Sequence, residues 1–113
     1  MKQDLRRDAR YPIELDVDLF SRGQRIGHFK TRDIGPSGLF IEIAPLRLRP
    51  GHPVDVAFSL PNCHIEVPGI VTHRTTAGMS IRFIVVSHAL FDALNELLSI
   101  EEFSSALAGY RQF

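Results

Sequence analysis

Six stretches of the chain, separated by turn-forming residues, have the pattern of strands: four alternate apolar and polar residues, residues 25–32 do so less regularly, and residues 63–74 form a longer, interrupted stretch. Successive side chains of a β-strand point to opposite faces, so a period of two is typical of strands with one buried and one wet face. The stretches recur at roughly the 8–12-residue spacing of antiparallel barrels and sandwiches, and no gap could hold a crossover helix. We expect strands at residues 13–19, 25–32, 39–43, 54–60, 63–74 and 81–85. Pro68-Gly69 interrupts the fifth stretch, which predicts a bend, a bulge or an edge position there.

The last quarter of the chain changes to helical spacing. Ser87 is placed to cap the start of this helix. Ser99 and Glu102 have the spacing of a capping box, which would begin a second helix. One long helix whose apolar stripe drifts in phase explains the same pattern, and the sequence leaves both alternatives open. The apolar positions are Leu90, Phe91, Leu94, Leu97 and Leu98, followed by Ile100, Phe103, Leu107 and Tyr110.

The 113 residues therefore predict a basic N-terminal arm (1–11), an antiparallel β-barrel or β-sandwich (12–86) and a helical segment (87–113). Thirteen basic residues balance thirteen acidic ones, so no overall field attracts nucleic acid or an anionic membrane. Cys63 is the single cysteine, which excludes an internal disulfide and fits a reducing compartment. The first residues are charged and no apolar run could span a bilayer, so we expect a cytoplasmic domain without a signal peptide or membrane span.

Residues with catalytic or metal-binding chemistry are scattered along the chain. The five histidines occur singly, without a helical pair or a Cys-x-x-Cys partner. No Gly-x-Ser-x-Gly elbow or phosphate-cradling loop before a helix is present. The acidic residues Asp16, Asp18 and Glu42 fall on the outward phase of strands, as a solvated face does. We expect no catalytic residues, no metal and no cofactor, and hence no enzyme.

Two polar segments remain as a candidate site. The first is Arg6-Arg7-Asp8-Ala9-Arg10. The planar guanidinium groups of Arg6 and Arg10 are spaced so that both can converge on one compact anion. The second is Asp33-Ile34-Gly35-Pro36-Ser37-Gly38, which we interpret as a turn between two strands. The Asp33 carboxylate could accept hydrogen bonds from a guanine edge, and the two glycines would let a ligand approach the backbone closely.

These segments resemble the two motifs of PilZ domains, the bacterial receptors for cyclic di-GMP. RRDAR matches an Arg-x-x-x-Arg motif, and DIGPSG matches in part an Asp/Asn-x-Ser-x-x-Gly motif. The strand from Gly78 to Phe83 is similar to the late Gly-x-Gly strand of the family. Over residues 5–98, the resemblance implies a six-stranded antiparallel barrel with a C-terminal helix, so we expect a mainly β fold with one or two such helices.

The resemblance also implies a binding mode, in which the arm closes over the barrel when cyclic di-GMP binds. Arg6 and Arg10 would contact phosphates and guanines, and Asp33 would bind a guanine edge. Gly35 stands where the family has serine; one lost hydrogen bond of about 1 kcal/mol implies roughly fivefold to tenfold weaker binding. Ser37 or the Gly35 N–H could substitute for it, and Ser80 replaces the second glycine of the late motif. The predicted ligand-binding residues are Arg6, Arg7, Arg10, Asp33, Gly35, Ser37, Gly38 and Ser80.

Two functions stay open at this point, besides a nucleic-acid-binding barrel that the zero net charge disfavours. The first is a cyclic di-GMP receptor that signals by ordering its arginine arm. The alternative is a diverged adaptor of pilus or motility machinery that binds only protein, because Gly35 and Ser80 depart from the motifs. Residues 100–113 would then contact a downstream protein or a second copy of the chain; packing of this segment on the chain's own barrel is the other alternative.

Overall fold

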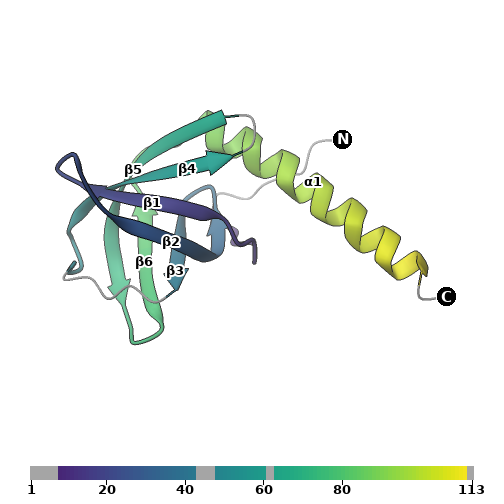
Figure 1. Ribbon diagram of the computed structural model, residues 1–113, viewed down its shortest axis with the longest axis horizontal. Coiled ribbons are helices and arrows are strands. Elements are labelled where there is room, and N and C mark those ends of the chain that lie inside the picture. Colours follow the sequence, from purple (N-terminus) through teal and green to yellow (C-terminus); the bar gives the residue numbers. More distant parts are fainter. Residues whose placement is uncertain (1–7, 43–47, 61–62, 112–113) are drawn as a thin grey trace.

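A closed, six-stranded antiparallel β-barrel with one C-terminal helix forms the protein (Figure 1), which confirms the predicted fold class. The computed structural model describes residues 8–42, 48–60 and 63–111, and describes the side chains only as far as Ser99. The barrel order is β1-β2-β3-β6-β5-β4, closed by pairing of β1 with β4. The elements are β1 (Asp16–Ser21), β2 (Gln24–Gly35), β3 (Gly38–Glu42), β4 (Pro53–Leu60), β5 (Cys63–Arg74), β6 (Gly78–Phe83) and α1 (His88–Arg111).

The core fills the barrel and is built from the inward phase of the strands. Leu19, Ile34 and Val56 are fully buried there, and Phe58 meets Phe83 edge-to-face with ring centroids 6.2 Å apart. Leu90 adds the first turn of α1 to the same core. Each buried aliphatic side chain contributes about 1.5–3 kcal/mol, so this interior supplies the main driving force for the fold.

The first strand begins later than the alternation predicts, at Asp16 instead of Ile13. The reason is Thr31, a buried threonine of β2. Its hydroxyl donates to the carbonyl of Ile13 (2.8 Å) and accepts the N–H of Leu15 (2.8 Å). The Thr31 hydroxyl thus satisfies backbone groups of Ile13 and Leu15 that would otherwise need strand partners. The regular β1–β2 ladder therefore starts only at Asp16.

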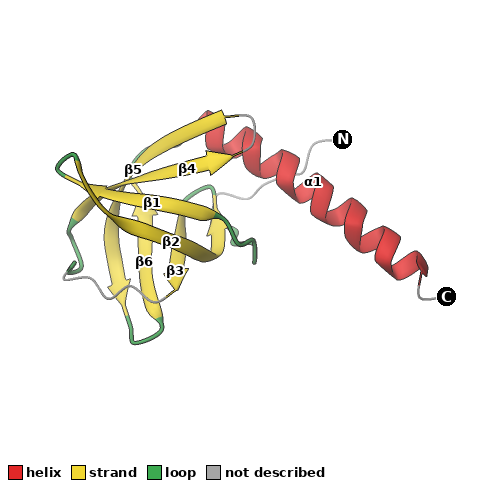
Figure 2. Cartoon of the chain, viewed as in Figure 1, coloured by secondary structure: helices red, strands yellow, loops and turns green. Residues whose placement is uncertain are grey.

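The predicted turn at residues 33–38 is wrong in extent. Strand β2 continues through Gly35 and β3 begins at Gly38, so Pro36 and Ser37 alone connect them (Figure 2). The strand continues because Ile34 is an inward core residue and its backbone pairs with Tyr11. Asp33 is therefore a strand residue with a fixed direction.

Two further details of the strands differ from the prediction. The β4–β5 ladder runs regularly through Pro68, and the irregularity of β5 lies between Val71 and His73, against β6. Strand β6 ends at Phe83, so Val85 lies in the connection to α1. The Ile84 N–H still donates to the carbonyl of Pro68 (3.1 Å), but the chain then turns toward the helix.

Helix α1 is a single continuous helix, which decides between the two alternatives for the last quarter. Ser87 caps its start as predicted, since the Ser87 hydroxyl accepts the Leu90 N–H at 3.1 Å. Ser99 starts no second helix; its hydroxyl donates to the carbonyl of Asn95 one turn earlier (2.9 Å). In the described part of the chain, no helix has both the length and the apolar character needed to cross a membrane.

Candidate functional site

A β-bulge in β2 aims two charged residues at the same side of the barrel. The register with β3 passes from Thr31↔Ile41 directly to Asp33↔Phe40, so Arg32 is the extra residue. Thr31 and Ile34 both point inward and are buried, whereas Arg32 is exposed and Asp33 is partly exposed. Bulges commonly re-aim side chains in this way beside binding sites. Here the bulge places Arg32 and Asp33 together on the outer face.

Asp33 lies between two arginines. Its Oδ1 accepts from Arg10 Nη1 at 3.0 Å, and its Oδ2 lies 3.5 Å from Arg32 Nε. The guanidinium of Arg32 also lies over an aromatic ring, with its central carbon 3.8 Å from the centroid of Phe40. Phe40 is outward in phase yet only 8% exposed, because Arg32 covers it. The four side chains form one charged and aromatic cluster on the outer face of β2 and β3, which we call the Asp33 cluster.

The end of the arm is held against this cluster by the backbone. The Tyr11 N–H donates to the carbonyl of Ile34 at 2.9 Å, and the Ile34 N–H donates back to Tyr11 at 3.0 Å. A side-chain carbon at Gly35 would collide with the carbonyl oxygen of Ala9. The arm therefore crosses the strand where Gly35 leaves room for it, and this crossing delivers Arg10 to Asp33.

Gly38 and Ser80 lie on the same outer face, on β3 and β6. A side-chain carbon at Gly38 would lie 3.0 Å from Arg10 Nη2 and would meet the Ile81 carbonyl. Phe40 of β3 pairs with Asp33 on one side and with Ser80 on the other. Phe40 therefore lies between these two residues across the sheet. Gly38 is thus brought to Arg10, whereas strand β3 lies between Ser80 and Asp33.

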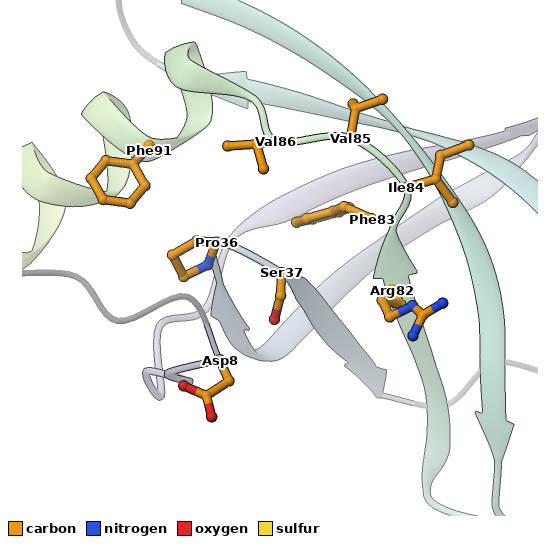
Figure 3. A pocket seen from close by; sticks show the side chains of 9 residues that line it. All are labelled: Asp8, Pro36, Ser37, Arg82, Phe83, Ile84, Val85, Val86 and Phe91. Atoms are coloured by element: carbon orange, nitrogen blue, oxygen red, sulfur yellow. The ribbon is translucent and has the colours of Figure 1, made fainter.

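Ser37 faces a different space. Its carbonyl accepts the Phe83 N–H at 2.8 Å, and it lines a pocket of about 910 Å³ between the arm, the β2–β3 connection and the start of α1 (Figure 3). Arg10 and Asp33 are not among the residues that line this pocket. Its lining residues are Asp8, Pro36, Ser37, Arg82, Phe83, Ile84, Val85, Val86 and Phe91.

Of the residues predicted from sequence, the structure gathers Arg10, Asp33, Gly35 and Gly38. Arg6 and Arg7 lie outside the described residues. Across residues 8–42, 48–60 and 63–111, no three His, Cys, Asp or Glu side chains lie where they could hold a metal ion.

Sequence reasoning missed Arg32 and Phe40. Phe40 gave a signal, because an aromatic residue on the outward phase of a strand needs a cover or a partner. Arg32 gave none, because assigning Asp33 to a turn concealed that the two residues share a face.

Comparison with known proteins identifies the class of this barrel. The PilZ domain family matches residues 4–99, so the chain belongs to the PilZ domain family. The family is one of cyclic di-GMP receptors, and its members are binding and adaptor domains, not enzymes. No curated protein matches the sequence.

Two solved structures share the fold. The Bacillus subtilis inhibitor of motility MotI/DgrA superposes with a TM-score of 0.68 and 16% identity, over 92% of this chain and 53% of that one. The chain thus spans about half the length of MotI/DgrA. The PilZ domain of CeSA from a cellulose-synthesizing bacterium gives a TM-score of 0.65 and 16% identity, over 83% of this chain and 99% of that domain. At such low identity the likeness concerns the fold alone.

Proposed function

We propose that this PilZ domain binds cyclic di-GMP on the outer face of β2 and β3 and acts as a receptor without catalysis. In this proposal Arg10 contacts a phosphate and a guanine, Asp33 accepts hydrogen bonds from a guanine edge, and Gly35 and Gly38 leave room for the arm that carries Arg10. Arg6 and Arg7 are proposed to close the arm over the ligand, and Ser37 and Ser80 to border it. The ligand would signal by ordering this arm, which changes the surface that a partner protein meets.

The observation that carries the proposal is the convergence of Arg10 on Asp33 across 23 positions of sequence. Two motif residues from distant segments share one outward face, and the backbone pairing of Tyr11 with Ile34 holds them together. A carboxylate for the guanine edge and a guanidinium for the phosphate thus lie 3.0 Å apart, within the reach of one nucleotide.

The ion pair between these residues does not oppose ligand binding strongly. The Arg10 and Asp33 side chains are 36% and 23% exposed, and an ion pair this accessible is worth about 0–1 kcal/mol. Two guanines and two phosphates offer several charge-assisted hydrogen bonds in exchange, each worth about 1.5–3 kcal/mol. The exchange therefore favours the bound state.

Calorimetric titration with cyclic di-GMP tests the proposal. We expect saturable binding by the wild type and, in Arg10→Ala, a loss of about 2 kcal/mol or more, which is roughly thirtyfold in affinity. Arg25→Ala is the matched control, since Arg25 is an exposed arginine of β2 paired with Asp18, away from the Asp33 cluster. No heat at near-millimolar ligand, or equal affinity in Arg10→Ala and Arg25→Ala, would refute the proposal.

A second candidate is a protein-binding adaptor, favoured by apolar surface near α1. Ile84, Val85 and Val86 are 53%, 49% and 57% exposed where the barrel joins the helix. The C-terminal half of α1 extends away from the strands (Figure 1) and carries the apolar positions of residues 100–110. The helix can self-associate only where these apolar positions are not covered by the chain itself. A measurement of self-association therefore separates this candidate from a monomeric receptor.

A further inference from the structure

We propose that Arg32, stacked on Phe40, forms a stacking subsite for one purine base of the ligand. This inference rests on the proposed function and extends it to a residue that neither sequence motif contains. The bulge in β2 is the structural reason for the subsite, because it turns Arg32 onto the face that carries Asp33.

The geometry of Arg32 suits a flat ligand. The central carbon of the guanidinium lies over the Phe40 ring, 3.8 Å from its centroid, while the side chain as a whole is 53% exposed. A guanidinium plane stacks on aromatic faces and is weakly hydrated, so its outer face can receive a purine with little desolvation penalty. Phe40 and a bound base would then enclose the cation between two π-systems.

The surroundings of the stack restrict how it can move. Nε of Arg32 lies 3.5 Å from Asp33 Oδ2, which limits rotation of the guanidinium about its plane. Gly78 leaves room for the ring in this position, because a side-chain carbon there would lie 2.7 Å from the edge of Phe40. A base stacked on Arg32 would have its hydrogen-bonding edge beside the Asp33 carboxylate. The same cluster thus offers both a stacking plane and an acceptor, as recognition of guanine requires.

Titration of variants with cyclic di-GMP tests this subsite. We expect Arg32→Ala to weaken binding at least about fivefold, as loss of stacking under one base does. Arg32→Lys keeps the charge but not the plane, so it should weaken binding nearly as much. Arg25→Ala again controls for loss of a positive charge, because Arg25 has similar exposure (57%) and a carboxylate partner. Thermal melts verify that each variant is folded.

The outcomes separate this inference from the proposed function. Wild-type binding with unchanged affinity in Arg32→Ala would overturn the subsite and leave the receptor function standing. Full affinity in Arg32→Lys would also overturn it, because charge alone would then explain the role of Arg32. Absence of wild-type binding would overturn both.

Discussion

A side-chain carbon at position 35 would occupy the place of the Ala9 carbonyl oxygen, and this contact changes the meaning of a single residue. By family resemblance, Gly35 lacks a serine hydroxyl that helps to hold the ligand. In the structure, Gly35 is the place where the arm crosses β2, with Arg10 Cδ also within 3.3 Å of the missing carbon. The glycine therefore permits the close packing that brings Arg10 to Asp33.

Restoring the family serine should accordingly fail to restore affinity. Gly35→Ser and Gly35→Ala both insert a carbon against the arm, and such overpacking costs about 1–3 kcal/mol. We expect both variants to melt several degrees lower and to bind cyclic di-GMP more weakly than the wild type. Melting curves and titrations of the pair check this. Tighter binding by Gly35→Ser, with Gly35→Ala unimproved, would show that the hydroxyl governs affinity after all.

His28 of β2 makes a second prediction at the residue scale. It faces two carboxylates of β1: its Nδ1 lies 2.9 Å from Asp18 Oδ1 and its Nε2 lies 3.2 Å from Asp16 Oδ1. Carboxylates only accept hydrogen bonds, so the doubly protonated ring is favoured, and the bonds to Asp18 and then Asp16 raise the pKa of His28 above 6.5. Bonds from Arg25 and then His28 lower the pKa of Asp18.

These directions fix the sign of the pH dependence. A raised folded-state pKa stabilises the protein fully below pH 6.5, and this contribution is lost as the pH rises through the folded value. Relative to His28→Gln, the wild type should therefore lose stability between neutral and mildly alkaline pH. Urea unfolding at pH 6 and pH 9 measures the difference, which added salt should reduce because the ring is exposed. A constant difference across this range would contradict the prediction.

At the scale of elements, the alternation in the sequence predicted six strands and the helix, because period and turn residues are local properties. The error at residues 33–38 has a physical cause. Asp, Gly, Pro and Ser all favour turns, but Ile34 is buried and Tyr11 supplies a pairing partner that local propensity cannot reveal. The bulge at Arg32 escaped prediction for the same reason, since it exists only in the register of β2 against β3. Arg32 therefore could not be assigned to the Asp33 cluster until the two strands were paired.

Capping of α1 offers a test at the same scale. The Ser87 hydroxyl accepts the Leu90 N–H, and Leu90 is part of the barrel core. Ser87→Ala should destabilise the protein by about 1 kcal/mol, and Ser87→Gly by only a few tenths. Ser99→Ala is the control, because Ser99 lies within the helix and alanine is the better helix former. Chemical denaturation ranks the three variants; equal stability of Ser87→Ala and the wild type would contradict the assigned cap.

At the scale of the whole molecule, α1 has two apolar stripes on different sides. Leu90 and Leu94 are buried in the barrel core. At about 100° per residue, the positions of Ile100, Phe103, Leu107 and Tyr110 lie roughly half a turn away from that side. A continuous helix cannot turn both stripes toward its own barrel. The spacing of three, four and three residues is that of a helix-pairing seam, which makes a second copy of the chain a suitable partner.

Sedimentation of the full chain and of residues 1–99 tests this interface. Among the side chains that the structure describes, Leu98 is the last that packs against the barrel core, and the family match ends at residue 99. We therefore expect the truncated protein to remain folded with little change in melting temperature. We expect the full chain to dimerise reversibly and the truncated chain to be monomeric. Leu107→Glu should abolish the dimer within the intact helix. Ser105→Glu adds the same charge on the other side of the helix and should leave the dimer unchanged, since its position lies outside the seam. A monomeric full chain at high concentration would exclude self-pairing and leave the receptor proposal, whose cluster lies on β2 and β3, unaffected.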